Sequence, residues 1–266
     1  VSLPTEGWRQ NAGLLMLISV VMLLLVLFIG QEVNGSTRWI ALPGPLPSIQ
    51  VSEFGKLGLI VYMAAFMSRF VLELRQHHLS IIRPLMILAV PGLLLLKAPD
   101  FGGLVVYTVC VIGMLVMAGA SLVIIVGLTI LLGGAFALLV IIEPYRLARW
   151  TSFLDPWADQ FATGYQLTQA LIAFGRGHVT GTGLGNSVQK LHYLPEAHTD
   201  FIFSVIGEEL GFITVVLLIC MYLCIVVMGL RISMRAKDGF GRLTAFGISL
   251  LLGLQAFANM AVVMGI

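Results

Sequence analysis

The chain has 266 residues, of which 59% are hydrophobic and only 11% are charged. A typical soluble domain has roughly 25% charged residues. This composition excludes an ordinary soluble fold and indicates an integral membrane protein. The formal net charge of +2 gives no reason to expect a nucleic-acid partner.

Apolar runs, taken in chain order, predict seven transmembrane helices, because a span needs about 20 apolar residues. The expected spans are residues 11–30, 52–70, 84–97, 101–119, 121–142, 201–230 and 243–266. The third is short and contains Pro91-Gly92, which predicts a kink, and Ala118–Ser121 separates the fourth from the fifth. The runs lack period-two alternation, so membrane strands are not expected.

Basic residues predict the orientation of the spans. The loop 69–83 holds three arginines against one acid, and the loop 231–242 holds four Lys or Arg residues against one acid. Such short basic loops are typical of the cytoplasmic side. The loops 31–51 and 143–200 and the turn Lys97–Asp100 are then expected to face outward.

The loop 143–200 is long enough to predict a functional or separately structured segment. Asp155-Pro156-Trp157 predicts a turn followed by the start of a helix. Residues 157–174 have the amphipathic pattern of a helix lying at the membrane interface. We therefore expect one transmembrane domain over residues 1–266, with this large extracytoplasmic loop.

The stretch from Gly181 to Phe203 is unusually polar for such an apolar chain, and it ends at the mouth of a span. Asp200 immediately precedes the apolar run and has two interpretations. It is a favoured residue for capping a helix start. A carboxylate that is partly buried there is also a good proton acceptor, which predicts a general base. Both roles are compatible.

Other polar residues at the expected outer ends of spans also allow two interpretations. Glu53 and Lys56 form either an i,i+3 ion pair or part of a binding site. Lys97 and Asp100 either pair across a turn or bind a ligand. Glu208 and Glu209 lie inside the sixth span. One of them is expected to pair with a cation or polar group from another span, because ionisable residues in lipid are costly.

Two further patterns have little specificity. Gly177, Gly181, Gly183 and Gly185 match no nucleotide motif, and they predict a tight loop whose backbone approaches a substrate or a helix. Glu196, His198 and Asp200 would hold a divalent cation if one is bound, although their spacing fits no known metal pattern. No other cofactor or metal is expected. The three cysteines are expected to be small buried hydrophobic residues.

Several motifs together resemble the SEDS family (shape, elongation, division and sporulation), and the resemblance runs in order along nearly the whole chain. The residues that carry it are Asn34–Trp39, Ser52–Lys56, Lys97–Gly102, Glu143–Arg146, Phe153–Pro156, Gly164–Gln166, Gly183–Ser187, Tyr193–Phe203 and Gly207–Gly211. The forms of Gly183–Lys190 and Pro195–Asp200 are most similar to the division members of the family.

This resemblance implies an all-α polytopic membrane protein with ten spans, of which this chain contains roughly the third to the ninth. It implies a peptidoglycan glycosyltransferase that polymerises lipid II at the outer face of the bacterial cytoplasmic (inner) membrane during cell division, by inverting transfer. Expected partners are lipid II, a class B penicillin-binding protein and other division membrane proteins at the septum.

The chemistry of the residues agrees with this implication. A new glycosidic bond needs a base, for which we predict Asp200. A pyrophosphate leaving group needs cations, for which we predict Lys56 and Lys97 before Arg38, Arg176 and Lys190. The other expected substrate-binding residues are Ser52, Glu53, Asp100, Gln189, Glu196, His198 and Thr199.

Two other functions stay open at this point. A lipid II flippase would show broken helices and internal repeats, and no convincing repeat is present. A non-catalytic division scaffold would not need Asp200 beside Glu196 and His198 at the mouth of a span.

Overall fold

The computed structural model describes residues 5–33, 36–40 and 48–266. Asn34 and Gly35, which belong to one of the motifs above, lie outside the described residues. The chain divides into two compact units. The first comprises residues up to Thr129 together with Val226–Leu252, and the second comprises Ile130–Ile225 together with Gly253–Ile266. Each unit is described by itself.

Within the described residues, seven helical segments are long and apolar enough to cross a membrane. They are α2 (Ala12–Ile29), α3 (Val51–Arg69), His78–Lys97, which consists of η1 (His78–Ile81) and α5 (Ile82–Lys97), α6 (Phe101–Ala118), α7 (Leu122–Ile142), α10 (Ile202–Arg235) and α11 (Gly239–Met264). The predicted spans are confirmed, and the protein is a multi-pass membrane protein. The kink at Pro91 stays a prediction, and α5 continues through that residue.

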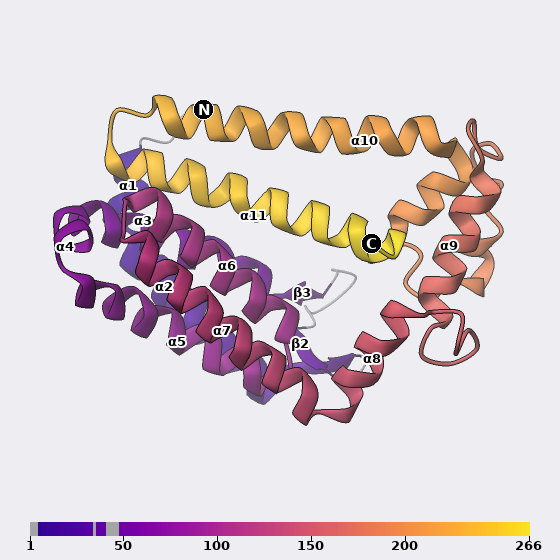
Figure 1. Cartoon of the computed structure of the whole chain (residues 1–266), viewed down its shortest axis with the longest axis horizontal. Coiled ribbons are helices and arrows are strands. Elements are labelled where there is room, and N and C mark those ends of the chain that lie inside the picture. Colours follow the sequence, from indigo (N-terminus) through magenta and orange to yellow (C-terminus); the bar gives the residue numbers. More distant parts are fainter. Residues whose placement is uncertain (1–4, 34–35, 41–47) are drawn as a thin grey trace. The chain divides into compact units, whose positions relative to one another are not determined.

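The first unit is built around α2, α3, α5 and α6, which lie side by side (Figure 1). Small residues allow close helix contacts: Gly58 of α3 lies against Ser19 of α2, where a Cβ atom would collide. Gly55 makes room in the same way for the Tyr107 hydroxyl of α6. That hydroxyl donates to the Ser52 carbonyl oxygen at 3.1 Å. These contacts fix the first turn of α3 against α6.

The predicted boundary between the fourth and fifth spans is confirmed at Gly119. This residue ends α6 in the left-handed conformation, with φ of +88°, which glycine adopts without the steric cost of a Cβ atom. The Arg75 side chain, at the end of the short helix α4 (Val71–Gln76), donates to the Ala118 carbonyl oxygen at 3.1 Å. A basic residue therefore satisfies a carbonyl that the helix end leaves unpaired.

A small antiparallel sheet, not predicted from the sequence, occupies the loop before α3. It consists of β1 (Gln31–Val33), β2 (Ser36–Ile40) and β3 (Ile49–Gln50), in that order. Trp39 pairs with Gln31 on one side and with Gln50 on the other. The strands are two to five residues long, so they give no alternating pattern long enough to be detected, and the all-α class is unaffected.

The loop 143–200 in the second unit contains two helices, α8 (Pro144–Leu154) and α9 (Tyr165–Gly177). Helix α8 was not predicted, although Pro144 in its first turn is a favoured starting residue. The helix start expected after Pro156 is wrong, because turns continue to Gly164. The Asp159 carboxylate accepts from the Thr163 backbone N–H (3.1 Å) and hydroxyl (2.8 Å). These hydrogen bonds hold the pKa of Asp159 below its usual value and stabilise the turn.

A hydrophobic cluster joins the elements of the second unit. Helix α9 lies beside the first part of α10 (Figure 1), and the rings of Phe174 and Phe203 meet edge to face at 5.8 Å. Phe201, Leu194 and Met260 are buried in the same cluster. The cluster therefore fixes both ends of the segment that carries the predicted base.

Two of the three cysteines differ from expectation. Cys110 of α6 is buried, whereas Cys220 and Cys224 are exposed along α10. They are apolar enough to face lipid, so exposure in a transmembrane helix carries no cost.

Candidate functional site

The predicted site residues fall into two groups, one in each unit. Arg38, Ser52, Glu53, Lys56, Lys97 and Asp100 belong to the first unit, and Arg176, Gln189, Lys190, Glu196, His198, Thr199 and Asp200 belong to the second.

Asp100 is the centre of the first group, and it is 3% exposed. Its Oδ1 atom accepts from the Gly103 backbone N–H at 3.0 Å, which makes it the N-cap of α6. The same oxygen lies 3.3 Å from an Arg38 guanidinium nitrogen. Of the two interpretations of Lys97 and Asp100, pairing across the turn is therefore wrong, and Asp100 pairs with Arg38, 62 positions away.

Lys97 is exposed at the end of α5, and its ammonium group forms no hydrogen bond or ion pair with any described residue. Lys56 differs sharply, because it is buried and lies 2.5 Å from Glu53 Oε1. The predicted i,i+3 ion pair is confirmed. The two lysines favoured as phosphate ligands thus have opposite environments.

Two buried oxygens of this group have no hydrogen-bond partner among the described residues. They are the Ser52 hydroxyl and Asp100 Oδ2. Buried polar atoms are usually satisfied, so these two oxygens are exceptions that keep unused capacity to accept a hydrogen bond. Tyr107 was not predicted from the sequence as a site residue. Its hydroxyl holds Ser52 in place by donating to the Ser52 backbone carbonyl. The sequence places Tyr107 two helical turns after Asp100 in α6, and this spacing could have indicated that Tyr107 belongs to the group.

The second group is organised by a break in α10. Gly211 has φ of +78° and ψ of −180°. In a regular helix the Phe212 and Ile213 N–H groups would bond to the carbonyls of Glu208 and Glu209. Here they donate to the carbonyls of His178 (3.0 Å) and Val179 (3.3 Å) instead.

The carbonyls freed by this break are taken up by the glycine-rich loop. Glu208 accepts from the Thr182 N–H, and Glu209 accepts from the Gly183 N–H, both at 3.0 Å. The loop 178–183 thus replaces two rungs of the helix hydrogen-bond ladder. The backbone N–H and C=O groups at the break therefore have hydrogen-bond partners within the protein, as non-helical backbone in a membrane protein requires. The expected close approach of the loop to a helix is confirmed.

We expect Gly211→Ala to lower the free energy of unfolding by about 1–3 kcal/mol, because its φ and ψ lie in a region that only glycine populates readily. A Cβ atom there would also collide with the Gly181 nitrogen and the Val179 oxygen. The measurement is the unfolding temperature of the purified protein. Gly175→Ala, at an open helical position of α9, is the matched control and should not destabilise. Equal stability of the two variants would contradict the assignment.

Glu208 and Glu209 pair with the loop and not with another span, which corrects the expectation from sequence. Glu208 has no exposed surface. Its carboxylate accepts from the Ser187 hydroxyl at 2.6 Å and lies 3.5 Å from Arg176. Glu209 pairs with Lys190 at 2.6 Å. The sequence could not show this, because a loop folding back onto the helix that follows it resembles no local pattern.

Asp200 is exposed, as are Glu196, His198 and Thr199. The partial burial expected for Asp200 is absent, and α10 begins two residues later, at Ile202. Its backbone carbonyl is held by the Asn259 side-chain amide at 3.1 Å. The Thr199 hydroxyl donates to a carboxylate oxygen of Glu196 at 2.7 Å. The carboxylate of Asp200 is therefore open to a ligand while its backbone is anchored.

Glu196, His198 and Asp200 do not form a cation site. Among the described residues, no group of three or more His, Cys, Asp or Glu side chains is placed to hold a metal ion.

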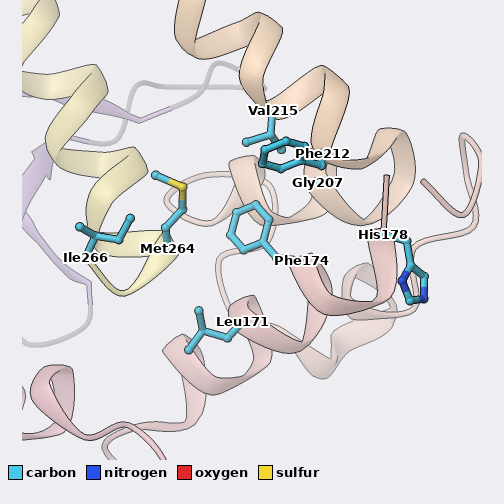
Figure 2. A pocket seen from close by; sticks show the side chains of 8 residues that line it. All are labelled: Leu171, Phe174, His178, Gly207, Phe212, Val215, Met264 and Ile266. Atoms are coloured by element: carbon cyan, nitrogen blue, oxygen red, sulfur yellow. The ribbon is translucent and has the colours of Figure 1, made fainter. Parts of the chain in front are cut away.

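An apolar cavity of about 360 Å³ lies in the second unit. Figure 2 shows its lining, with Phe174 at the centre and His178 at the rim. The lining residues are Leu171, Phe174, His178, Gly207, Phe212, Val215, Met264 and Ile266. None of the predicted site residues lines it, and apart from His178 its lining side chains are apolar.

Comparisons with known proteins agree with these observations. The FtsW/RodA/SpoVE family, described as cell cycle proteins, matches residues 1–266. A probable peptidoglycan glycosyltransferase FtsW of Halomonas elongata is 52% identical over 99% of this chain and 67% of its own length. The corresponding protein of Methylomonas methanica is 46% identical over 100% of this chain and 69% of its own length. The chain thus spans about two thirds of these relatives.

Two solved structures are also similar. One belongs to a study of the coordination of polymerization and crosslinking by a peptidoglycan synthase complex. It has a TM-score of 0.77 and 27% identity, over 99% of this chain and 73% of that one. The other is the rod shape determining protein RodA of Thermus thermophilus. It has a TM-score of 0.66 and 27% identity, over 98% of this chain and 68% of that one. With a match along its full length and relatives of such high identity, the chain belongs to the FtsW/RodA/SpoVE family of cell cycle proteins.

Proposed function

We propose that this chain is the membrane core of a peptidoglycan glycosyltransferase, which polymerises lipid II into glycan strands at the outer face of the cytoplasmic membrane during cell division. Relatives at 52% and 46% identity are named probable peptidoglycan glycosyltransferase FtsW. The observation that carries the proposal is the carboxylate of Asp200, which is exposed two residues before a transmembrane helix. A lipid-linked sugar diffusing in the bilayer can reach such a position.

The step is an inverting glycosyl transfer. Asp200 takes the proton of the 4-hydroxyl group on the GlcNAc of the acceptor. The resulting oxygen attacks the anomeric carbon of the donor from the face opposite its leaving group. The bond from that carbon to the pyrophosphate oxygen breaks, and undecaprenyl pyrophosphate leaves with the electron pair. A β-1,4 bond replaces the sugar–phosphate bond.

The leaving pyrophosphate requires positive charge. Of the five predicted cations, Arg38, Lys56, Arg176 and Lys190 each face a carboxylate in this structure. Lys97 is exposed and pairs with no described residue. We therefore assign the first contact with pyrophosphate to Lys97. Lys56, the other lysine favoured from the sequence, stays the proposed second cation.

The experiment that tests the function uses the full-length protein with its transpeptidase partner and purified lipid II. Glycan strands separated on a gel are the expected product. A lipid transporter is the second candidate, because the break in α10 at Gly211 is a feature of transporters. Lipid II translocation across liposomes without any glycan product would establish that alternative. Absence of both activities would point to a scaffold.

We expect the protein to form a complex with a single-span class B penicillin-binding protein, at the division septum of the inner membrane. A structurally similar protein belongs to a peptidoglycan synthase complex. Helix α10 presents many exposed apolar side chains, including Leu217 and Met221, whereas α6 packs against α3 and α5. A photo-crosslinker at Leu217 should capture the partner, and one at Val116 of α6 is the matched comparison. Full activity of the isolated protein, with no crosslink from either position, would exclude the complex.

A further inference from the structure

Glu208 is a fully buried carboxylate inside a transmembrane helix. An ionisable group in such a place is costly and is a sign of function. The catalytic step above makes no use of it. Its contacts therefore show what it contributes.

Three consecutive residues of the loop direct donors at this one carboxylate. The Ser187 hydroxyl donates to Oε2 at 2.6 Å, the Val188 N–H donates to Oε1 at 3.2 Å, and the Gln189 N–H donates to Oε2 at 3.4 Å. The neighbouring Glu209 accepts from the Ser187 N–H at 3.3 Å and from the Lys190 ammonium at 2.6 Å. Hydrogen bonds to a charged acceptor are among the strong ones in proteins. Residues 187–190 are thus fastened to α10 by two adjacent carboxylates.

The fastened residues lead directly to the predicted base. A π-helical turn, η2 (Gln189–Tyr193), begins within them. The Leu194 N–H then donates to the Gln189 carbonyl at 2.9 Å, and Leu194 is buried in the hydrophobic cluster. From there the chain runs through turns to Asp200. The segment 187–201, which precedes α10, is therefore held at its beginning by Glu208 and Glu209 and at its end by the start of the helix.

We propose that Glu208 is a positioning residue, which fastens residues 187–189 to α10 and thereby fixes the segment that carries Asp200. The proposal rests on the proposed function for its effect on catalysis. The fastening itself is a property of the loop and is measurable without substrate. Glu209 contributes less to this fastening, because its side chain is 13% exposed. Its partner, Lys190, also has a flexible side chain.

The test uses the full-length protein in complex with its partner and the variant Glu208→Gln. An amide keeps the size of the side chain, but its NH₂ group is a donor and cannot accept a hydrogen bond from the loop N–H groups that it would face. Hydrogen exchange of residues 187–193 should become at least about tenfold faster in the absence of substrate. The kcat for lipid II polymerisation should fall at least about tenfold, with KM changed less than about twofold. Glu208→Asp, which keeps the charge, should restore part of the kcat.

Two further variants keep the test decisive. Glu73→Gln, at a half-exposed carboxylate paired with Arg83, is the matched control and should change neither exchange nor kcat. Ser187→Ala removes one hydrogen bond to Glu208 and should reproduce a smaller form of both effects. If Glu208→Gln does not fold, hydrogen exchange and kcat are measured on Ser187→Ala instead.

Unchanged hydrogen exchange at residues 187–193 in Glu208→Gln overturns the proposal, whatever the activity. A wild-type protein that makes no glycan overturns the proposed function instead, and the exchange result then still decides whether Glu208 fastens the loop.

Discussion

Asp200→Asn is expected to abolish polymerisation of lipid II, the largest effect of any single change proposed for this protein. The amide has the size of the carboxylate but cannot accept the proton of the attacking hydroxyl group. The side chain is exposed, and the anchoring contact from Asn259 goes to the backbone carbonyl. The variant should therefore fold like the wild type. The measurement is glycan synthesis from purified lipid II, together with the unfolding temperature.

A matched control is available in the same loop. Asp155 is also exposed and accepts a weak hydrogen bond from the Ala158 N–H at 3.3 Å, which an asparagine oxygen can also accept. Asp155→Asn should retain full activity. Polymerisation at the wild-type rate by Asp200→Asn would show that the base is another group. Loss of activity in both variants would indicate that the loop, and not the carboxylate of Asp200, is sensitive to substitution.

The transmembrane helices were predictable because lipid imposes one simple rule on all of them. Each span needs a long apolar run, and the boundary at Gly119 needs a residue that tolerates a positive φ, here +88°. Both signals are local in sequence. The short helix α8 and the three-stranded sheet lack such a signal, because neither buries a long apolar run. Short polar elements of this kind are determined by their tertiary neighbours.

The polar residues of the site were recognisable, but their partners were not. Glu53 and Lys56 are one helical turn apart, so their ion pair follows from local geometry. The partner of Asp100 is Arg38, and the partners of Glu208 come from the loop around Ser187. Only the fold brings these residues together. The expected partial burial of Asp200 failed for the same reason, since exposure depends on how the preceding turns pack.

Lys97→Met is expected to reduce turnover at least about tenfold, equivalent to about 1.4 kcal/mol of activation free energy. Lys97 is exposed and pairs with no described residue, so its replacement should leave the unfolding temperature unchanged. Lys56→Met should cause a comparable loss of turnover and also lower the stability, because it removes the ion pair with Glu53. The comparison of turnover with stability therefore distinguishes a cation that only binds pyrophosphate from one that also holds the helix start.

The control for both variants is Lys237→Met, at an exposed lysine in the loop expected to be cytoplasmic, which should have the wild-type rate. Lys97→Arg keeps the charge and should retain most of the activity, because the charge and not the shape of the ammonium group is required at a pyrophosphate. Normal turnover in both Lys97→Met and Lys56→Met would show that neither lysine binds the pyrophosphate. The developing charge would then have to be met by another of the predicted cations Arg38, Arg176 and Lys190, each of which already faces a carboxylate.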